Sequence, residues 1–125
     1  MTTPKSIAFM GPDTVSPRET ELLEALGAAI AGSDHALHTT PARGANAAVA
    51  TGYRATSGRP AKFHTKKLNT AAPWLIAYGE TITTRVLDLE PSPVNDDWVF
   101  LHTEDDLETF VECIFGILAQ DGKAF

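Results

Sequence analysis

Residues 6–32 read SIAFMGPDTVSPRETELLEALGAAIAG and predict a strand, a turn and a helix in succession. The segment SIAFM is mostly apolar, is followed by Gly-Pro and is too short for a helix, so it predicts a buried strand. Ser16 can cap a helix, Pro17 fits the first helical position, and Glu19 completes a capping box. Leucine, alanine and isoleucine then recur at helical spacing as far as Gly32, which predicts one apolar helix face.

The same order of strand and helix continues along the chain. Helices are expected at 44–56 and after Thr103, and strands at 35–39, 60–64, 74–78 and 98–102. Residues 80–90 fit a short helix or a returning strand, and the alternation favours the helix. Residues 65–73 and 91–97 predict loops. The pattern predicts an α/β fold: a single Rossmann-like three-layer domain over residues 1–125, with a mostly parallel sheet of about five strands and helices on both faces.

Composition narrows the class of protein. The chain has 125 residues, of which 43% are hydrophobic and 21% charged, as in soluble globular domains. No apolar run approaches the roughly 20 residues that cross a bilayer, and the N-terminus lacks the apolar core of a signal peptide. A lone cysteine, Cys113, can form neither an internal disulfide nor a structural zinc site. These features predict a cytoplasmic protein with no membrane partner.

Charge is unevenly distributed. Residues 1–67 hold eight Lys or Arg and five Asp or Glu, a balance of +3, whereas residues 68–125 hold two and eleven, a balance of -9. The overall charge of -6 argues against a nucleic-acid partner, because phosphate contacts need a positive face. One basic cluster is better explained as a solvated helix end and loop than as a phosphate site; it consists of Arg54, Arg59, Lys62, Lys66 and Lys67.

Ligands of parallel α/β sheets bind outside the carboxyl ends of the strands. This rule selects three loops, 11–14, 40–46 and 79–81. In the second loop, Gly44 lets a ligand approach the backbone, Arg43 is suited to clamp a phosphate or carboxylate, and the helix start offers free N–H groups. A plain connection with a glycine turn explains the same residues.

The stretch from Ala28 to Phe63, centred on Ala42-Arg43-Gly44-Ala45-Asn46-Ala47-Ala48, resembles the SLOG superfamily. This group includes the lysine-decarboxylase-like phosphoribohydrolases and the Rossmann-like domain of the DNA-processing protein A family. The resemblance also takes in residues 7–12, Gly58-Arg59-Pro60 and, more loosely, residues 75–81, and it implies nucleotide or nucleotide-derived ligands. The chain departs from the pattern: Thr40-Pro41 replaces a glycine pair, Asn46 stands where many relatives have aspartate, and the Pro-Gly-Gly-x-Gly-Thr signature is absent.

The leading hypothesis is a sensor or sequestering module that binds a nucleotide-type small molecule without a cofactor. Its expected ligand-binding residues are Gly11, Pro12, Asp13, Thr14, Thr40, Arg43, Gly44, Asn46, Gly79, Glu80 and Thr81. The alternative is an enzyme that hydrolyses or transfers at the N-glycosidic bond of nucleoside monophosphates, with Glu80 and Asp13 as the acid–base pair or nucleophile. Turn or helix-start acids are the structural explanation of both carboxylates. A third hypothesis, a protein-interaction module, follows from the charge asymmetry alone.

The remaining chemistry-bearing residues predict little. The four histidines lack metal-site spacing, since His35 and His38 would face opposite sides of a strand, and no metal is expected. His38, His64 and His102 lie near the ends of strands, where one of them could touch a ligand, but structural roles explain them better. Cys113 is expected on the buried side of the last helix. Tyr53, on a helix face of small residues, is expected to stack on a base or fill a subunit contact, and self-association is expected of so small a domain.

Overall fold

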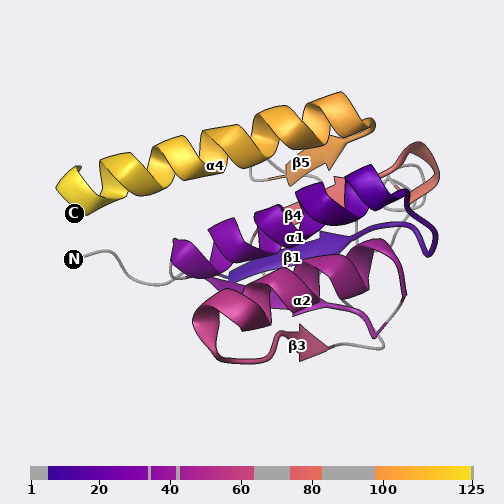
Figure 1. Ribbon diagram of the computed structural model, residues 1–125, viewed down its shortest axis with the longest axis horizontal. Coiled ribbons are helices and arrows are strands. Elements are labelled where there is room, and N and C mark those ends of the chain that lie inside the picture. Colours follow the sequence, from indigo (N-terminus) through magenta and orange to yellow (C-terminus); the bar gives the residue numbers. More distant parts are fainter. Residues whose placement is uncertain (1–5, 34, 42, 64–73, 83–97, 125) are drawn as a thin grey trace.

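Five parallel strands form one sheet in the order β3-β2-β1-β4-β5 (Figure 1). The computed structural model describes residues 6–33, 35–41, 43–63, 74–82 and 98–124. All four strand pairs are parallel, as the alternation of strands and helices predicts. The strands are β1 (Ser6–Met10), β2 (Ala36–Thr39), β3 (Lys62–Phe63), β4 (Trp74–Tyr78) and β5 (Trp98–Leu101).

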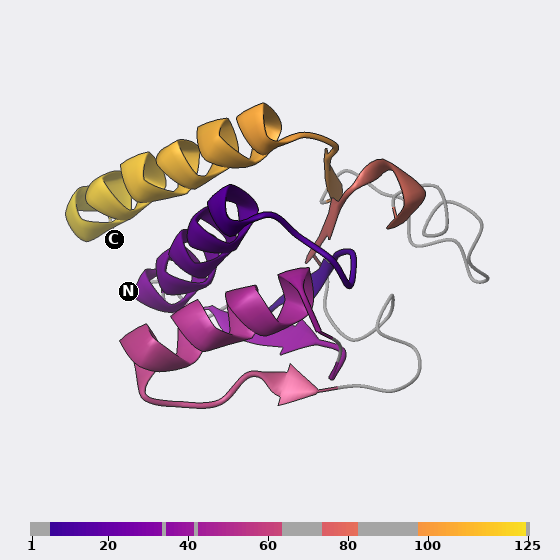
Figure 2. The ribbon, with the colours of Figure 1, turned by 45° about the vertical axis from the view of Figure 1, so that its right-hand side comes forward.

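Three helices, α1 (Pro17–Gly32), α2 (Ala45–Ser57) and α4 (Glu104–Ala124), lie side by side on one face of the sheet (Figures 1 and 2). The capping box of α1 is formed in both directions: the Glu19 N–H donates to Ser16 Oγ, and the Ser16 N–H donates to the Glu19 carboxylate. At the start of α4, Thr103 Oγ1 accepts the Asp106 N–H at 3.2 Å. The predicted start of each of these two helices is thereby confirmed.

Residues alternate between the two faces of the sheet along each strand. Phe9, Leu37, Ile76 and Tyr78 point toward the helices and join the main core with residues of α1, α2 and α4. The opposite face carries a second, smaller cluster of buried residues, with Ile82 packed against it; the buried members are Ala8, Leu75 and Ala77. The described residues thus show the predicted mixed α/β fold with a five-stranded all-parallel sheet, consistent with a Rossmann-like three-layer domain. The sequence predicts helices on both faces; the three long helices of the described residues lie on one face, and the other face carries apolar side chains.

Helix α2, which buries a face of small residues, lies very close to α1. Ala45, Ala48, Val49 and Gly52 are all buried on one face of α2, as their spacing predicts. A Cβ atom added at Gly52 would overlap the Glu24 carbonyl of α1, and one added at Gly27 would overlap the backbone of α2 at Val49, so the two backbones are nearly in contact. This contact fixes the position of α2, and with it the loop that precedes α2.

Some predicted boundaries differ from those observed. The strand predicted at 60–64 begins only at Lys62, because Pro60 lacks a donor and Ala61 is not yet paired with β2, and residue 64 lies outside the described residues. Residues 80–82 are helical, as favoured, while the rest of 80–90 and the predicted loops 65–73 and 91–97 lie outside the described residues. Among the helices that are described, none is long and apolar enough to span a membrane.

Candidate functional site

The chain changes direction across the sheet between β1 and β4. From β1 it passes to β2 on one side, whereas β4 is followed by β5 on the other side. Loops that leave neighbouring parallel strands in opposite directions are the usual ligand-binding position of open α/β sheets. The loop after β1 (residues 11–16) and the turn after β4 (residues 79–81) therefore meet at this point, and both contain residues that the sequence selected.

Asn46, the second residue of α2, joins the first two of the selected loops. Its Oδ1 accepts the backbone N–H of Gly11 at 3.0 Å, and its Nδ2 donates to Thr40 Oγ1 at 2.7 Å. Asn46 is only 4% exposed, so the hydrogen bond to Gly11 is shielded from water, and the one to Thr40 is partly shielded. Asn46 thus holds the β1–α1 loop against the β2–α2 loop, and in this structure its amide acts as a positioning group.

Gly44 and Gly11 make the close approach of these loops possible. Gly44 caps α2 at a φ of 67°, and an added Cβ would overlap the backbone of Pro12 and Asp13. The N–H of Ala45 donates to the Pro12 carbonyl at 2.9 Å, so one of the amides at the start of α2 is already satisfied within the protein. At Gly11 an added Cβ would meet the Cβ of Ala45. Both glycines are therefore needed for packing, whatever binds nearby.

Gly79 brings the turn after β4 into the same neighbourhood. Its φ is 93°, its N–H donates to the Leu101 carbonyl at 2.8 Å, and a Cβ added to it would lie 3.4 Å from the Pro12 ring. Asp13 follows Pro12 and Glu80 follows Gly79, so the two carboxylate residues flank this contact. Both side chains are exposed, as are those of Thr14 and Thr81.

Arg43 is the cation of the second loop. It directly precedes Gly44 and is exposed, so its guanidinium is accessible to an anion from solvent. Thr40, in contrast, is half-buried and its hydroxyl accepts the hydrogen bond from Asn46. The residues selected from the sequence thus fall into two groups: Gly11, Gly44, Thr40 and Asn46 build the frame, and exposed polar side chains surround it.

Sequence reasoning missed a polar cluster at the same edge, on the helix side. The hydroxyl of Tyr78, the last residue of β4, donates to the Glu19 carboxylate at the start of α1. Ser16 Oγ donates to Glu104 of α4 at 3.0 Å, so the cluster joins β4, α1 and α4. The alternation of side chains along the strand could have indicated the position of Tyr78, because Tyr78 and Ile76 point to the same, helix-facing side of the sheet.

This cluster shifts the ionisation of its members. Burial raises the pKa of the Tyr78 hydroxyl, and its hydrogen bond to the Glu19 carboxylate raises it further. Burial also raises the pKa of Glu19, but the hydrogen bonds accepted from Tyr78 and Ser16 outweigh that effect, and the pKa lies below its ordinary value of 4.5. The pair is therefore a carboxylate and a neutral phenol at neutral pH.

Two of the expected placements are wrong. Tyr53 is 3% exposed and its hydroxyl donates to the His35 carbonyl at 3.0 Å, so it is a core residue with no free ring face for a base or a subunit. Cys113 is exposed, because it lies on the polar side of α4 rather than beside Leu107 and Val111. His38 is buried in β2, His102 is exposed, and His64 lies outside the described residues. Within the described part of the chain, no group of three or more His, Cys, Asp or Glu residues is arranged to hold a metal.

Comparison with known proteins adds no identification. No protein-family model matches the chain, and no curated protein matches it in sequence.

Proposed function

We propose that the chain binds a nucleotide or a nucleotide-derived small molecule at the carboxyl edge of the sheet, between the loops after β1, β2 and β4, and acts as a sensor or sequestering module. The observation that carries this proposal is the Asn46 bridge, which ties Gly11 to Thr40 through one buried and one partly buried hydrogen bond. A frame of this kind fixes the backbone of the loops that carry the exposed polar side chains, which lowers the entropy cost of binding.

The roles of the surrounding residues follow from their exposure. Arg43 supplies the cation for a phosphate, Asp13 and Thr14 form the wall on the side of β1, and Glu80 and Thr81 close the site beyond Gly79. These groups are supported by the packing described above, which involves Gly11, Pro12, Thr40, Gly44 and Asn46. The same ligand class is implied by the resemblance of residues 28–63 to the SLOG superfamily.

A thermal-shift screen against nucleoside monophosphates, cyclic nucleotides, dinucleotides and ADP-ribose tests the proposal. A ligand present at about 100 times its dissociation constant stabilises the fold by about 2.7 kcal/mol, which is easily measured in a small domain. The Arg43→Gln variant should bind the best ligand at least tenfold more weakly, because a charge-assisted hydrogen bond contributes roughly 1.5–3 kcal/mol. Arg54→Gln, at an equally exposed arginine of α2, is the matched control and should bind normally. A flat screen, or equal affinity in the Arg43 variant, would contradict the proposal.

One contact favours a second candidate function, cleavage or transfer at an N-glycosidic bond. The approach of Gly79 to Pro12 brings the residues that follow them, Glu80 and Asp13, to the same edge of the sheet, which supports a role for their carboxylates as a pair. This function predicts release of free base from nucleoside monophosphates and its loss in Glu80→Gln. Binding of a nucleoside monophosphate without release of free base would exclude the enzymatic function and leave the proposal of a sensor or sequestering module.

A further inference from the structure

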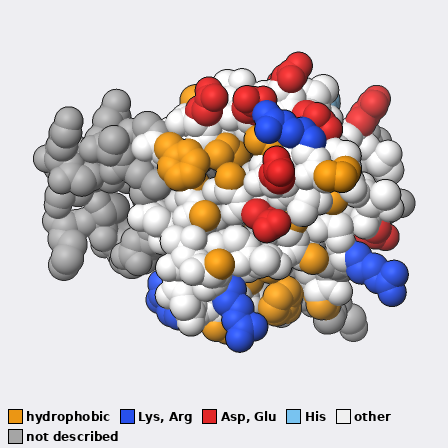
Figure 3. All heavy atoms as spheres, viewed as in Figure 1, with side chains coloured by type: hydrophobic (Ala, Val, Ile, Leu, Met, Phe, Trp, Pro, Cys, Tyr) orange, Lys and Arg blue, Asp and Glu red, His pale blue; other side chains and the backbone are white. Residues whose placement is uncertain are grey.

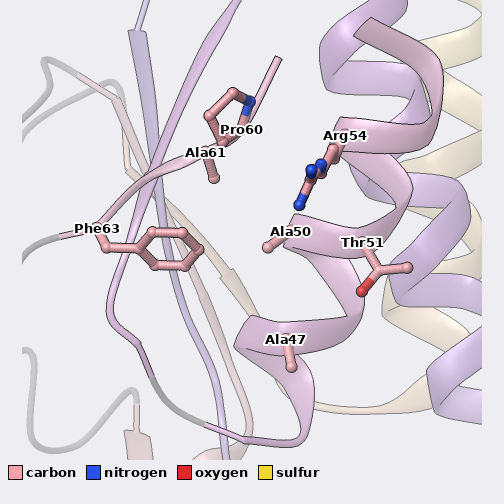
Figure 4. Close-up of a pocket in the computed structure, with 7 residues that line it drawn as sticks. All are labelled: Ala47, Ala50, Thr51, Arg54, Pro60, Ala61 and Phe63. Carbon is pink, nitrogen blue, oxygen red and sulfur yellow. The ribbon is translucent and has the colours of Figure 1, made fainter. Parts of the chain in front are cut away.

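A pocket lies between the outer side of α2 and the chain that leads into β3 (Figure 4). Its volume is about 270 Å³, and it shares no lining residue with the carboxyl-edge site. Arg54 of the basic cluster lines it, Arg59 lies on the chain that leads into β3, and Lys62 is the first residue of β3. The lining residues are Ala47, Ala50, Thr51 and Arg54 of α2, together with Pro60, Ala61 and Phe63.

The turn after α2 builds this pocket. Gly58 ends α2 in the left-handed conformation, with a φ of 72°, and its N–H donates to the Arg54 carbonyl at 2.9 Å. Ser57 Oγ accepts the Arg59 N–H and donates to the Arg59 carbonyl, both at 3.0 Å. These bonds fold residues 59–63 back alongside α2, and pairing of Lys62 with His38 of β2 fixes the far end.

The lining is apolar apart from two side chains. Alanine methyl groups and Pro60 form the walls, and the ring of Phe63 is 54% exposed although it is large and apolar. Figure 4 shows the guanidinium of Arg54 directed into the gap between α2 and residues 60–61, and the Phe63 ring directed across the gap toward α2. The polar groups on the lining are this guanidinium and the hydroxyl of Thr51.

The surrounding chain makes the potential at this pocket positive. Arg54 lines it, Arg59 and Lys62 lie on the chain that leads into and begins β3, and residues 43–63 contain no Asp or Glu. The Arg54 guanidinium forms no ion pair with a carboxylate of the described residues. The ion pair Arg18–Glu108 joins α1 to α4 instead. In Figure 3 acidic side chains gather over α4 and α1, and basic ones along the edge formed by α2 and β3. The field therefore favours an anion.

We propose that this pocket binds a small organic acid with an aromatic or branched apolar body and a single carboxylate. The body packs on Phe63 and on the Ala50 methyl group, and the carboxylate accepts hydrogen bonds from Arg54. A monoanion suits the pocket better than a phosphate ester, because one guanidinium in an apolar lining offsets the desolvation of one charge and not of two. The inference does not rest on the proposed function, since it involves different residues and a different ligand class.

Phenylacetate and its uncharged analogue phenylacetamide are suitable probes. Titration of the ¹⁵N-labelled protein with phenylacetate should produce saturable shifts of the amide signals of Ala47, Ala50, Thr51 and Phe63. Phenylacetamide should bind about tenfold more weakly, since it cannot form the charge-assisted hydrogen bond. The absence of saturable shifts, equal binding of both probes, or shifts centred on residues 11–14 and 43–46 would each overturn the proposal.

Two pairs of variants locate the site. Arg54→Gln should reduce phenylacetate affinity to that of phenylacetamide, whereas Arg43→Gln, which tests the other site, should leave it unchanged. Ala50→Leu should abolish binding by filling the pocket, whereas Ala55→Leu makes the same exchange at an exposed position of α2 outside the lining and should bind normally. If Ala50→Leu is unfolded at the temperature of the titration, the comparison of Arg54→Gln with Arg43→Gln still tests the proposal. Normal binding by Arg54→Gln would overturn the proposal.

Discussion

Asn46 contributes to stability through both ends of its amide. In Asn46→Ala the buried N–H of Gly11 loses its acceptor, so we expect the free energy of unfolding to fall by about 1–3 kcal/mol. In Asn46→Asp the carboxylate still accepts the Gly11 N–H, the Thr40 hydroxyl can rotate to donate to it, and the positive end of α2 is near. Urea unfolding at neutral pH should therefore rank Asn46→Asp above Asn46→Ala. The reverse order would show that the bridge is not the source of the stability.

The Tyr78–Glu19 hydrogen bond predicts a dependence of stability on pH at both ends of the scale. The folded pKa of Tyr78 is raised above its ordinary 10, so its contribution is complete below pH 10 and declines as the pH rises above 10. The folded pKa of Glu19 is lowered below 4.5, so its contribution is complete above pH 4.5 and is lost as the pH falls through the folded value.

Tyr78→Phe should weaken both dependences, because it removes the phenol and one of the hydrogen bonds to the carboxylate. Urea unfolding of the two proteins from acid to alkaline pH measures the difference. Tyr53→Phe, which removes the hydroxyl bonded to the His35 carbonyl, is the control and should keep the alkaline decline due to Tyr78. If Tyr78→Phe follows the wild-type curve throughout, the pair has no energetic role.

At the scale of elements, the packing of α1 on α2 requires glycine. Gly52→Ala would ordinarily stabilise a helix by about 1 kcal/mol, but here the new methyl group would overlap the Glu24 carbonyl. Overpacking of this kind costs roughly 1–3 kcal/mol, so the variant should unfold at lower urea concentration. Thr56→Ala, at an exposed position of the same helix, should not. Equal or greater stability of Gly52→Ala would mean that the helices can separate without cost.

Most helices and strands could be predicted from neighbouring residues in the sequence. The features that were missed depend on contacts between residues far apart in the sequence. Ser16-Pro17-Arg18-Glu19 specified the start of α1 because a capping box depends on four neighbouring residues. The small-residue face of α2 could also be predicted, because its residues lie close together in the sequence. The bridge from Asn46 to Gly11 spans 35 positions, and that from Tyr78 to Glu19 spans 59, so no pattern along the chain reveals either. Tyr53 was misplaced because its hydroxyl partner, the His35 carbonyl, is backbone and carries no sequence signal.

At the scale of the whole molecule, charge is separated between the α4 edge of the helix layer, which is acidic, and the α2 edge, which is basic (Figure 3). Such a field is screened over about 10 Å at 0.1 M salt and over about 3 Å at 1 M. We therefore expect phenylacetate to bind several-fold more weakly in molar sodium chloride than at low salt, with phenylacetamide nearly unaffected. The same titration at two salt concentrations measures both, and an equal salt effect on the two probes would exclude an electrostatic origin.

The strand order also has a consequence for the protein as it leaves the ribosome. β1 pairs with β2 and β4, and Ile7 of β1 lies opposite Trp74 of β4. Until residues 74–78 have emerged from the ribosome, the nascent chain can assemble β1, α1, β2 and α2, but β1 then remains an open edge with apolar residues on both faces. During that interval a second nascent chain can pair with the same edge. The time spent between residues 57 and 78 in translation therefore sets how long the half-built sheet is exposed to misassembly.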